Sequence, residues 1–148
     1  MTALLEQRIL GIDYGSRRVG LALSDPMGII AQPIDAVKQS SELVADLRTV
    51  VEREHVQTII VGMPLNLKGQ QAQTAQEVQK FVEQLRTELS MEVATWDERF
   101  TTTIAQQTMI AMGTKKKELQ QKNGRIDSMA AAVMLQNYLD NKKQSHID

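Results

Sequence analysis

The sequence contains no cysteine and only two histidines, His55 and His146. The absence of cysteine excludes disulfide bonds and thiolate metal ligands, and two imidazoles are too few for a histidine-rich zinc site. A metal bound by this chain would therefore take oxygen ligands, which suit hard cations such as Mg²⁺ or Mn²⁺.

Long apolar runs are also missing. None approaches the ~20 residues that a membrane-spanning helix needs. At the N-terminus, Glu6 and Arg8 interrupt the stretch that would have to form the apolar core of a secretory signal. We therefore expect a cytoplasmic protein that makes no membrane contact.

The composition is that of an ordinary globular domain of 148 residues, with 42% hydrophobic and 24% charged residues. This length predicts one domain over residues 1–148. The net charge of −1 is unevenly distributed: residues 1–114 hold ten basic and fourteen acidic residues, and residues 115–148 hold seven and four. The sequence thus predicts a local basic patch on a mildly acidic body.

The N-terminal part predicts an antiparallel meander. Apolar segments at residues 8–13, 18–24 and 29–37 are typical of strands, and turn-forming residues at 25–28 separate the second from the third. Pro33 has no N–H for strand pairing, so we expect the third strand to lie at an edge of the sheet.

After residue 40 the apolar spacing is that of helices alternating with strands. We expect helices at 41–54, 71–89, 101–112 and 126–139, with Ser40 or Ser41 as N-cap of the first, and strands at 56–61 and 91–96. A basic loop at 113–124 and a frayed tail at 141–148 complete the chain. The order predicts an α/β fold with a five-stranded mixed sheet, an antiparallel three-strand meander plus two parallel strands, flanked by helices.

Asp13 stands at the carboxyl end of the first strand, where ligands gather in α/β sheets. Gly11 and Gly15, on either side, let other backbone approach this acid closely. Asp13 is therefore a candidate metal ligand and catalytic residue. The alternative is an aspartate that only starts a turn.

Two further acids stand at element ends. Glu98 lies between the last strand and a helix, where an acid also favours the helix dipole, and Asp97 is an alternative for the same role. Asp127 begins the final helix, where it could act only as an N-cap. Ala130 and Ala131, three and four residues further on, are small enough to let the helix pack close to the sheet, or to leave space beside Asp127 for a metal and a phosphate.

Cationic and amide side chains that could hold a phosphate backbone are spread along the chain. The candidates for substrate binding are Arg17, Arg18, Asn66, Lys68, Arg99, Lys115, Lys116, Lys117 and Arg125. The loop at 62–69 could line a cleft or only connect two elements, and the lysine run could be a solvated face. Trp96 and Tyr14 suit base stacking, although core packing is the more common use of such residues.

Four motifs recur in the order and spacing of a known family. They are Leu10–Asp25 (LGIDYGSRRVGLALSD), Val61–Asn66 (VGMPLN) with Gly69, Asp97–Thr102 (DERFTT) and Ile126–Ala131 (IDSMAA), followed by Leu135–Leu139 (LQNYL). The match runs from about residue 8 to residue 140. On these residues the chain resembles the YqgF-type pre-16S ribosomal RNA nucleases, relatives of the RuvC Holliday-junction resolvases.

The resemblance implies a ribonuclease H-like fold and matches Asp13, Glu98 and Asp127 to the family's acidic triad. It implies phosphodiester hydrolysis with Mg²⁺ or Mn²⁺. Our hypothesis for the mechanism is that two cations ~4 Å apart would activate water and stabilise the leaving oxygen, with Asp13 shared between them and Glu98 and Asp127 each holding one side. Two positions depart from RuvC-like relatives. Gly62–Pro64 stands where those proteins end their fourth strand with an acid, and Ala130 stands where their final helix often carries a second one.

We therefore expect a metal-dependent nuclease in 5′-end processing of pre-16S ribosomal RNA, a monomer or weak homodimer that binds structured RNA. One alternative is a resolvase that acts on branched DNA as a dimer. Another is a sugar-kinase or actin-like ATPase lobe, because Gly11–Ser16 resembles the first phosphate loop of that superfamily, although such proteins need two lobes. The third is a non-enzymatic nucleic-acid-binding factor that uses the basic loop.

Overall fold

A five-stranded mixed sheet forms the centre of the fold, which a computed structural model describes for residues 8–64, 70–97 and 128–145. The strands are β1 (Arg8–Asp13), β2 (Arg18–Ser24), β3 (Ala31–Lys38), β4 (Val56–Met63) and β5 (Glu92–Asp97), in the order β3-β2-β1-β4-β5. The first three pair antiparallel, and β1–β4 and β4–β5 pair parallel. The predicted meander with two added parallel strands is confirmed.

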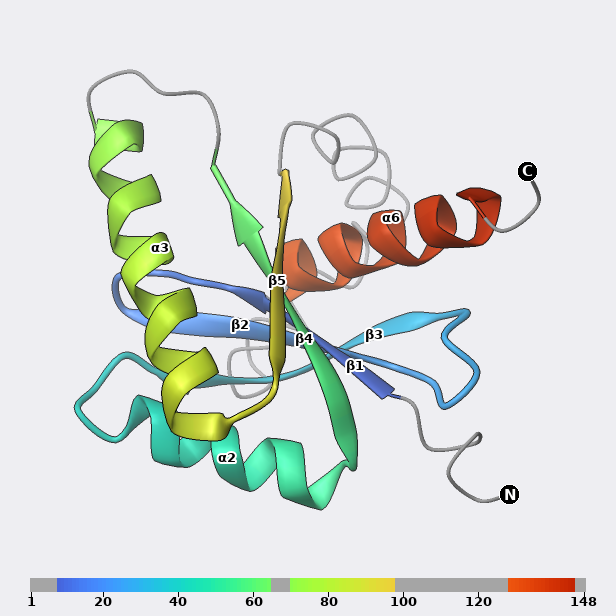
Figure 1. Cartoon of the computed structure of the whole chain (residues 1–148), viewed down its shortest axis with the longest axis horizontal. Coiled ribbons are helices and arrows are strands. Elements are labelled where there is room, and N and C mark those ends of the chain that lie inside the picture. Colours follow the sequence, from blue (N-terminus) through green and yellow to red (C-terminus); the bar gives the residue numbers. More distant parts are fainter. Residues whose placement is uncertain (1–7, 65–69, 98–127, 146–148) are drawn as a thin grey trace, which may run out of the picture.

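Helices cover both faces of this sheet (Figure 1). Helices α2 (Leu43–Arg53) and α3 (Gln70–Leu89) pack on one face, named here the α2/α3 face. Helix α6 (Met129–Ser145) packs on the opposite face, named here the α6 face. No helix in the described part of the chain is long and apolar enough to cross a membrane.

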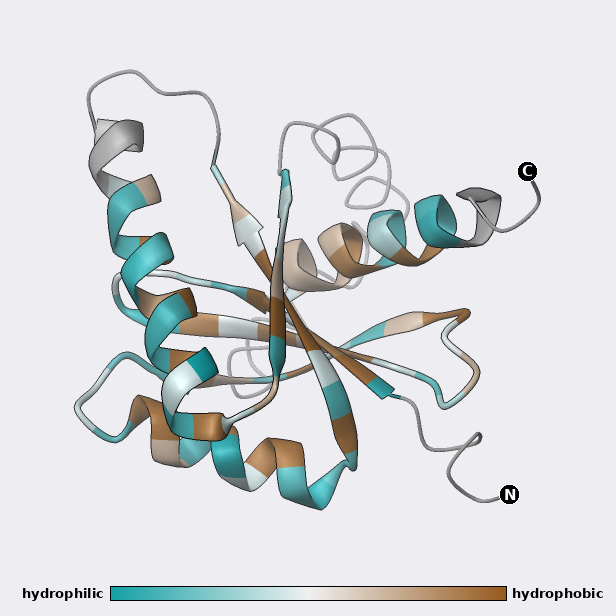
Figure 2. Cartoon of the chain, viewed as in Figure 1, coloured by the Kyte–Doolittle hydropathy of each residue, from teal (hydrophilic) through white to brown (hydrophobic). Residues whose placement is uncertain are grey.

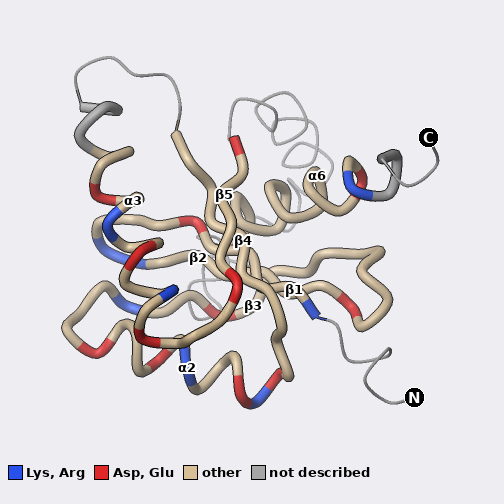
Figure 3. Tube along the Cα trace, in the orientation of Figure 1, with Lys and Arg blue, Asp and Glu red and all other residues tan. Residues whose placement is uncertain are grey.

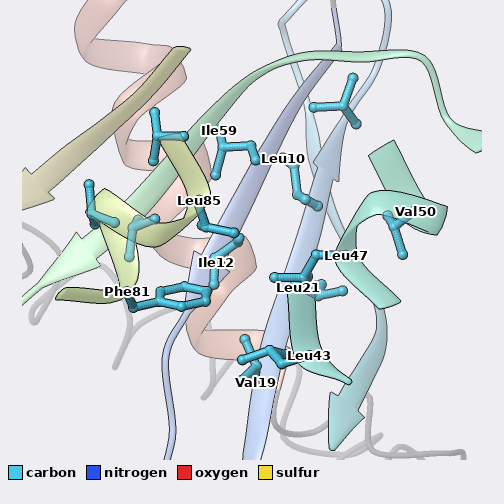
Figure 4. Close-up of a cluster of buried hydrophobic side chains, with 14 of the residues drawn as sticks. Leu10, Ile12, Val19, Leu21, Leu43, Leu47, Val50, Ile59, Phe81 and Leu85 are labelled. Carbon is cyan, nitrogen blue, oxygen red and sulfur yellow. The ribbon is translucent and has the colours of Figure 1, made fainter. Parts of the chain in front are cut away.

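The larger hydrophobic core lies between the sheet and helices α2 and α3 (Figure 4). Alternate strand residues point into it, as the period of two predicts. Its labelled members in Figure 4 are Leu10, Ile12, Val19, Leu21, Leu43, Leu47, Val50, Ile59, Phe81 and Leu85. Hydrophobic and hydrophilic residues alternate along α2 (Figure 2), and the buried ones are Leu43, Leu47 and Val50, at the spacing that places apolar side chains on one side of a helix.

A smaller core on the α6 face depends on a glycine. Its buried residues are Ile9, Ala22, Ile60, Ala131, Ala132, Met134, Leu135 and Leu139. A Cβ added at Gly11 would lie only 2.9 Å from the Cβ of Leu135, closer than real Cβ contacts come. Gly11 therefore lets α6 pack directly onto β1, which confirms that this glycine permits close approach.

The third strand begins two residues later than predicted, at Ala31 instead of Ile29. The reason is Asp25, whose Oδ1 accepts hydrogen bonds from the N–H groups of Ile29 (2.7 Å) and Ile30 (2.8 Å). Both N–H groups are thereby removed from strand pairing, and their side chains are exposed. Pro33 lies in β3 at the edge of the sheet, as predicted.

The prediction that Ser40 or Ser41 caps the first helix is wrong. The residue before α2 is Glu42, which makes no side-chain capping bond. Ser40 instead forms a turn before the helix, because its Oγ accepts the N–H of Glu42 at 3.1 Å and its carbonyl accepts the N–H of Leu43 at 3.2 Å.

The prediction of a frayed tail from Asn141 is wrong for residues 141–145, because α6 continues to Ser145. One contact between side chains four residues apart reaches this extension: Lys142 Nζ lies 5.9 Å from the ring centre of Tyr138. Residues 146–148 lie outside the described part.

Substitution of Gly11 by alanine tests the contact between β1 and α6. The added methyl would clash with the Cβ of Leu135, which cannot move away by a change of rotamer, so α6 must shift. We therefore expect a loss of ~1–3 kcal/mol in the free energy of unfolding. Urea denaturation followed by circular dichroism measures this. An unchanged midpoint would show that α6 does not pack this closely.

Substitution of Asp25 by asparagine tests the turn between β2 and β3. Partial burial raises the pKa of Asp25, but the N–H groups of Ile30, Ile29 and Met27 outweigh it, so the pKa is lower than usual. A folded-state pKa below the unfolded value near ~3.9 stabilises the fold above that pH, and this contribution is lost as the pH falls through the folded-state pKa.

We therefore expect the original protein to lose more free energy of unfolding between pH 6 and pH 3 than Asp25→Asn does, as measured by urea denaturation at each pH. Parallel pH dependences of the two proteins would contradict this account of Asp25.

Candidate functional site

Three parallel strands end at the same edge of the sheet. Strands β1, β4 and β5 run in one direction and end at Asp13, Met63 and Asp97. Asp13 follows Ile12, which pairs with Val61, and Asp97 pairs with Met63. The carboxyl edge of the sheet therefore presents two of the predicted acidic positions on described residues.

Asp13 belongs to the α6 face. Ile12 is buried in the core on the α2/α3 face, and Gly11 lies against Leu135 of α6. Because side chains alternate along a strand, the carboxylate of Asp13 lies on the same face as α6. Asp13 is half-buried, so solvent and solutes can reach it.

Glycines flank Asp13 on both neighbouring strands. Gly20 pairs with Asp13 across β1 and β2. On β4, Gly62 follows Val61, the partner of Ile12. Ala22 and Ile60, two residues from these glycines, belong to the core on the α6 face, so alternation puts both glycines on that face. A carboxylate with no side chain beside it on either strand leaves room for a cation and a phosphate.

Asp97 lies on the opposite face. Ala94 and Trp96 pack against the core under α6, while Val93 is buried in the core on the α2/α3 face. Alternation therefore directs Asp97 to the α2/α3 face, away from Asp13. This geometry makes Asp97 a poor alternative to Glu98 as a co-ligand of Asp13.

A buried serine fixes the start of α6 beside this edge. The Oγ of Ser128 accepts the N–H of Leu21 at 3.0 Å, and Ser128 is fully buried. Leu21 follows Gly20, the cross-strand partner of Asp13. The β2–β3 pairing has a register shift between Val19 and Leu21, which explains why a side chain serves this N–H.

The turn after Asp13 is held by contacts on both sides. The Tyr14 ring packs on Phe81 of α3, with ring centres 4.4 Å apart. A Cβ at Gly15 would overlap the carbonyl oxygen of Arg18, so only glycine fits there, as the sequence predicts. Gln39 closes the turn from β3: its Nε2 donates to the Gly15 carbonyl at 2.8 Å and its backbone N–H to the Arg17 carbonyl at 2.9 Å.

Basic side chains gather where β2 begins. A pocket of about 440 Å³ has Gly15, Ser16, Arg17 and Arg18 in its wall. Lys38 pairs directly with Arg18 in the β2–β3 ladder. The sequence analysis did not select Lys38, because it lies one residue beyond the expected end of the third strand and its pairing depends on the register shift.

Most of the other predicted site residues lie outside the described part. These are the acids Glu98 and Asp127 and the substrate-binding candidates Asn66, Lys68, Arg99, Lys115, Lys116, Lys117 and Arg125. Within residues 8–64, 70–97 and 128–145, no group of three metal-binding side chains comes together. Of the triad, the structure therefore describes Asp13 alone.

The two aromatic residues considered for base stacking are packed against the protein. Tyr14 contacts the core on the α2/α3 face, and Trp96 contacts the core on the α6 face. The Trp96 Nε1 donates to Asn137 Oδ1 at 3.0 Å, and its ring meets Tyr138 edge-on at 5.5 Å. The prediction of core packing is confirmed for both.

Comparison with known structures supports the fold. The chain superposes on the RuvC protein of T. thermophilus in complex with a Holliday junction substrate, with a TM-score of 0.63 and 14% identity over 94% of this chain and 96% of that one. It also superposes on the Holliday junction resolvase of fowlpox virus, with a TM-score of 0.56 and 13% identity over 92% and 99%. The predicted ribonuclease H-like fold is confirmed.

Comparison of sequences is more specific. A relative from Chlorobium chlorochromatii, named "Putative pre-16S rRNA nuclease", is 41% identical over 140 residues, which cover 94% of this chain and 99% of the relative. The family model described as "RuvX: Holliday junction resolvase" matches residues 7–141. Because both matches span nearly the whole chain, the protein belongs to the RuvX family.

Proposed function

We propose that this protein is a metal-dependent nuclease in which Asp13, Glu98 and Asp127 hold Mg²⁺ or Mn²⁺. The observation that carries the proposal is the position of Asp13: a half-buried carboxylate at the carboxyl edge, on the α6 face, between Gly20 and Gly62. Membership of the RuvX family and relatives named as nucleases support the same activity.

Chain connectivity supports the other two acids. Glu98 directly follows Asp97, the last residue of β5, and Asp127 directly precedes Ser128, which is bonded to Leu21. Consecutive Cα atoms are ~3.8 Å apart, so this connectivity is compatible with both acids serving the same site as Asp13. The proposal requires that both side chains turn to the α6 face, where Asp13 lies.

The donor set fits a hard cation. The chain has no cysteine, and the proposed ligands are all carboxylates, which are the ligands that Mg²⁺ and Mn²⁺ prefer. A bound cation would polarise the phosphodiester and favour ionisation of an attacking water. Asp13 would position it from β1, and Arg17 and Arg18 would hold the phosphate backbone beside it.

The substrate that we propose is precursor 16S ribosomal RNA, cleaved near its 5′ end in the cytoplasm. The names of relatives at 41% and 40% identity support this choice. Holliday junctions are the second candidate, favoured by the description of the matching family and by the substrate bound to the RuvC neighbour. A resolvase should act as a symmetric dimer, because a junction offers two equivalent cleavage sites.

Substitution of Asp13 by asparagine tests the catalytic assignment. Asparagine keeps the shape but removes the charge, so we expect Mn²⁺-dependent cleavage of structured RNA to be abolished while the protein remains folded. Gel analysis of labelled RNA measures cleavage, and thermal unfolding measures stability.

Asp97→Asn is the matched control, because Asp97 ends a neighbouring strand but lies on the α2/α3 face. We expect this control to keep its cleavage activity. Equal cleavage by the original protein and Asp13→Asn would remove Asp13 from the mechanism. RNA binding without turnover in every protein would favour the non-enzymatic alternative.

A second experiment separates the two substrates. Precursor 16S RNA and a four-way DNA junction, each tested with the same protein and Mn²⁺, should show cleavage of the RNA and little cleavage of the junction. Size-exclusion chromatography under the same conditions should show no stable dimer. Paired cuts in the junction by a dimer would instead support the resolvase function.

A further inference from the structure

We propose that Lys38, together with Arg17 and Arg18, binds a phosphate of the nucleic-acid backbone next to Asp13, and that Gln39 holds this binding surface in shape. This inference rests on the proposed nuclease function. It adds two residues, Lys38 and Gln39, to the proposed substrate-binding surface.

The first observation is an unfavourable pairing. Lys38 and Arg18 are direct partners in the antiparallel β2–β3 ladder, and both are exposed. Directly opposed side chains have Cβ atoms ~4.5–5.5 Å apart, where two like charges repel and weaken the sheet. A phosphate that contacts both side chains would offset this repulsion.

The second observation is the face on which the pair lies. Val19 packs in the core on the α2/α3 face and its partner Val37 packs against the same core. The next residue outward on each strand, Arg18 and Lys38, therefore points to the α6 face. Asp13 lies on that face too, so the basic pair and the acid share one surface.

The third observation is the short separation between them along β2. Gly20 is the cross-strand partner of Asp13, and it is the next residue after Arg18 that faces α6. Two strand residues span ~7 Å, and glycine places no side chain in that span. A strand of nucleic acid can therefore contact Arg18 and Lys38 while an adjacent phosphodiester lies at Asp13.

The fourth observation is preorganisation. Gln39 follows Lys38 and bonds two carbonyl groups of the turn, those of Gly15 and Arg17. The side chains of Arg17 and Lys38 make no hydrogen bond or ion pair within the described part of the chain, so their donors are available to a ligand. Figure 3 shows basic residues where β2 begins. Gln39 thus acts as a positioning residue that fixes the turn beside the phosphate.

The test is a binding titration of the full chain in EDTA, so that cleavage plays no part. The probe is a fluorescein-labelled single-stranded RNA of about 20 nucleotides, and anisotropy is recorded from ~50 to ~200 mM NaCl. For Lys38→Gln we expect weaker binding, by up to about fivefold, as for one exposed ion pair. The slope of log K against log salt should fall by ~0.7, the value for one lost phosphate contact.

Lys80→Gln is the matched control, because Lys80 is an exposed lysine of α3 on the other side of the sheet. We expect it to bind with the slope of the original protein. A Lys38→Gln slope equal to that of Lys80→Gln would overturn the proposal and leave Lys38 as a charge that blocks edge-to-edge strand pairing.

Gln39→Leu tests the positioning role. It removes no charge, so we expect weaker binding with an unchanged salt slope, and a purely structural residue would lower the melting temperature without changing affinity in the folded protein. Binding equal to that of the original protein would overturn this part. Because these titrations need no metal, their failure is distinct from failure of the nuclease assignment, which the Asp13→Asn cleavage assay decides.

Discussion

The close contact between α6 and β1 at Gly11 is the constraint on which the rest of the site depends. With no Cβ at Gly11, the Cβ of Leu135 reaches the backbone of β1, and α6 lies low over the sheet. The same approach brings Ser128 within 3.0 Å of the Leu21 N–H. Packing and one buried hydrogen bond therefore fix the start of α6 beside Asp13.

The register shift in the β2–β3 ladder has two consequences for the same edge. It leaves the Leu21 N–H for Ser128, and it brings Lys38 opposite Arg18. A regular ladder would have used that N–H within the sheet and shifted the lysine to another partner. One irregularity thus anchors α6 and assembles the basic pair, as bulges near functional edges often do.

The sequence predicted the bounds of β1 and β2 correctly, because each is a short apolar run between turn residues. The prediction from sequence failed where a polar side chain elsewhere in the chain determines the bounds of a strand. Ile29 and Ile30 look like strand residues, but the Asp25 carboxylate takes their N–H groups. The opposition of Lys38 and Arg18 was equally hidden, since register is a property of two strands together. The face of Asp13 could be predicted from alternation, whereas the side chains of Glu98 and Asp127 lie outside the described part.

The two faces of the sheet differ in how much apolar side-chain surface they bury. Large side chains such as Leu10, Ile12 and Phe81 fill the α2/α3 face, where most apolar burial takes place. Near Asp13, the α6 face has glycine at 20 and 62 and alanine at 22, so little apolar surface is buried beside the acid. Removing the Asp13 charge therefore disturbs few packing contacts. The apolar burial that holds the fold together is therefore concentrated on the face opposite the proposed site.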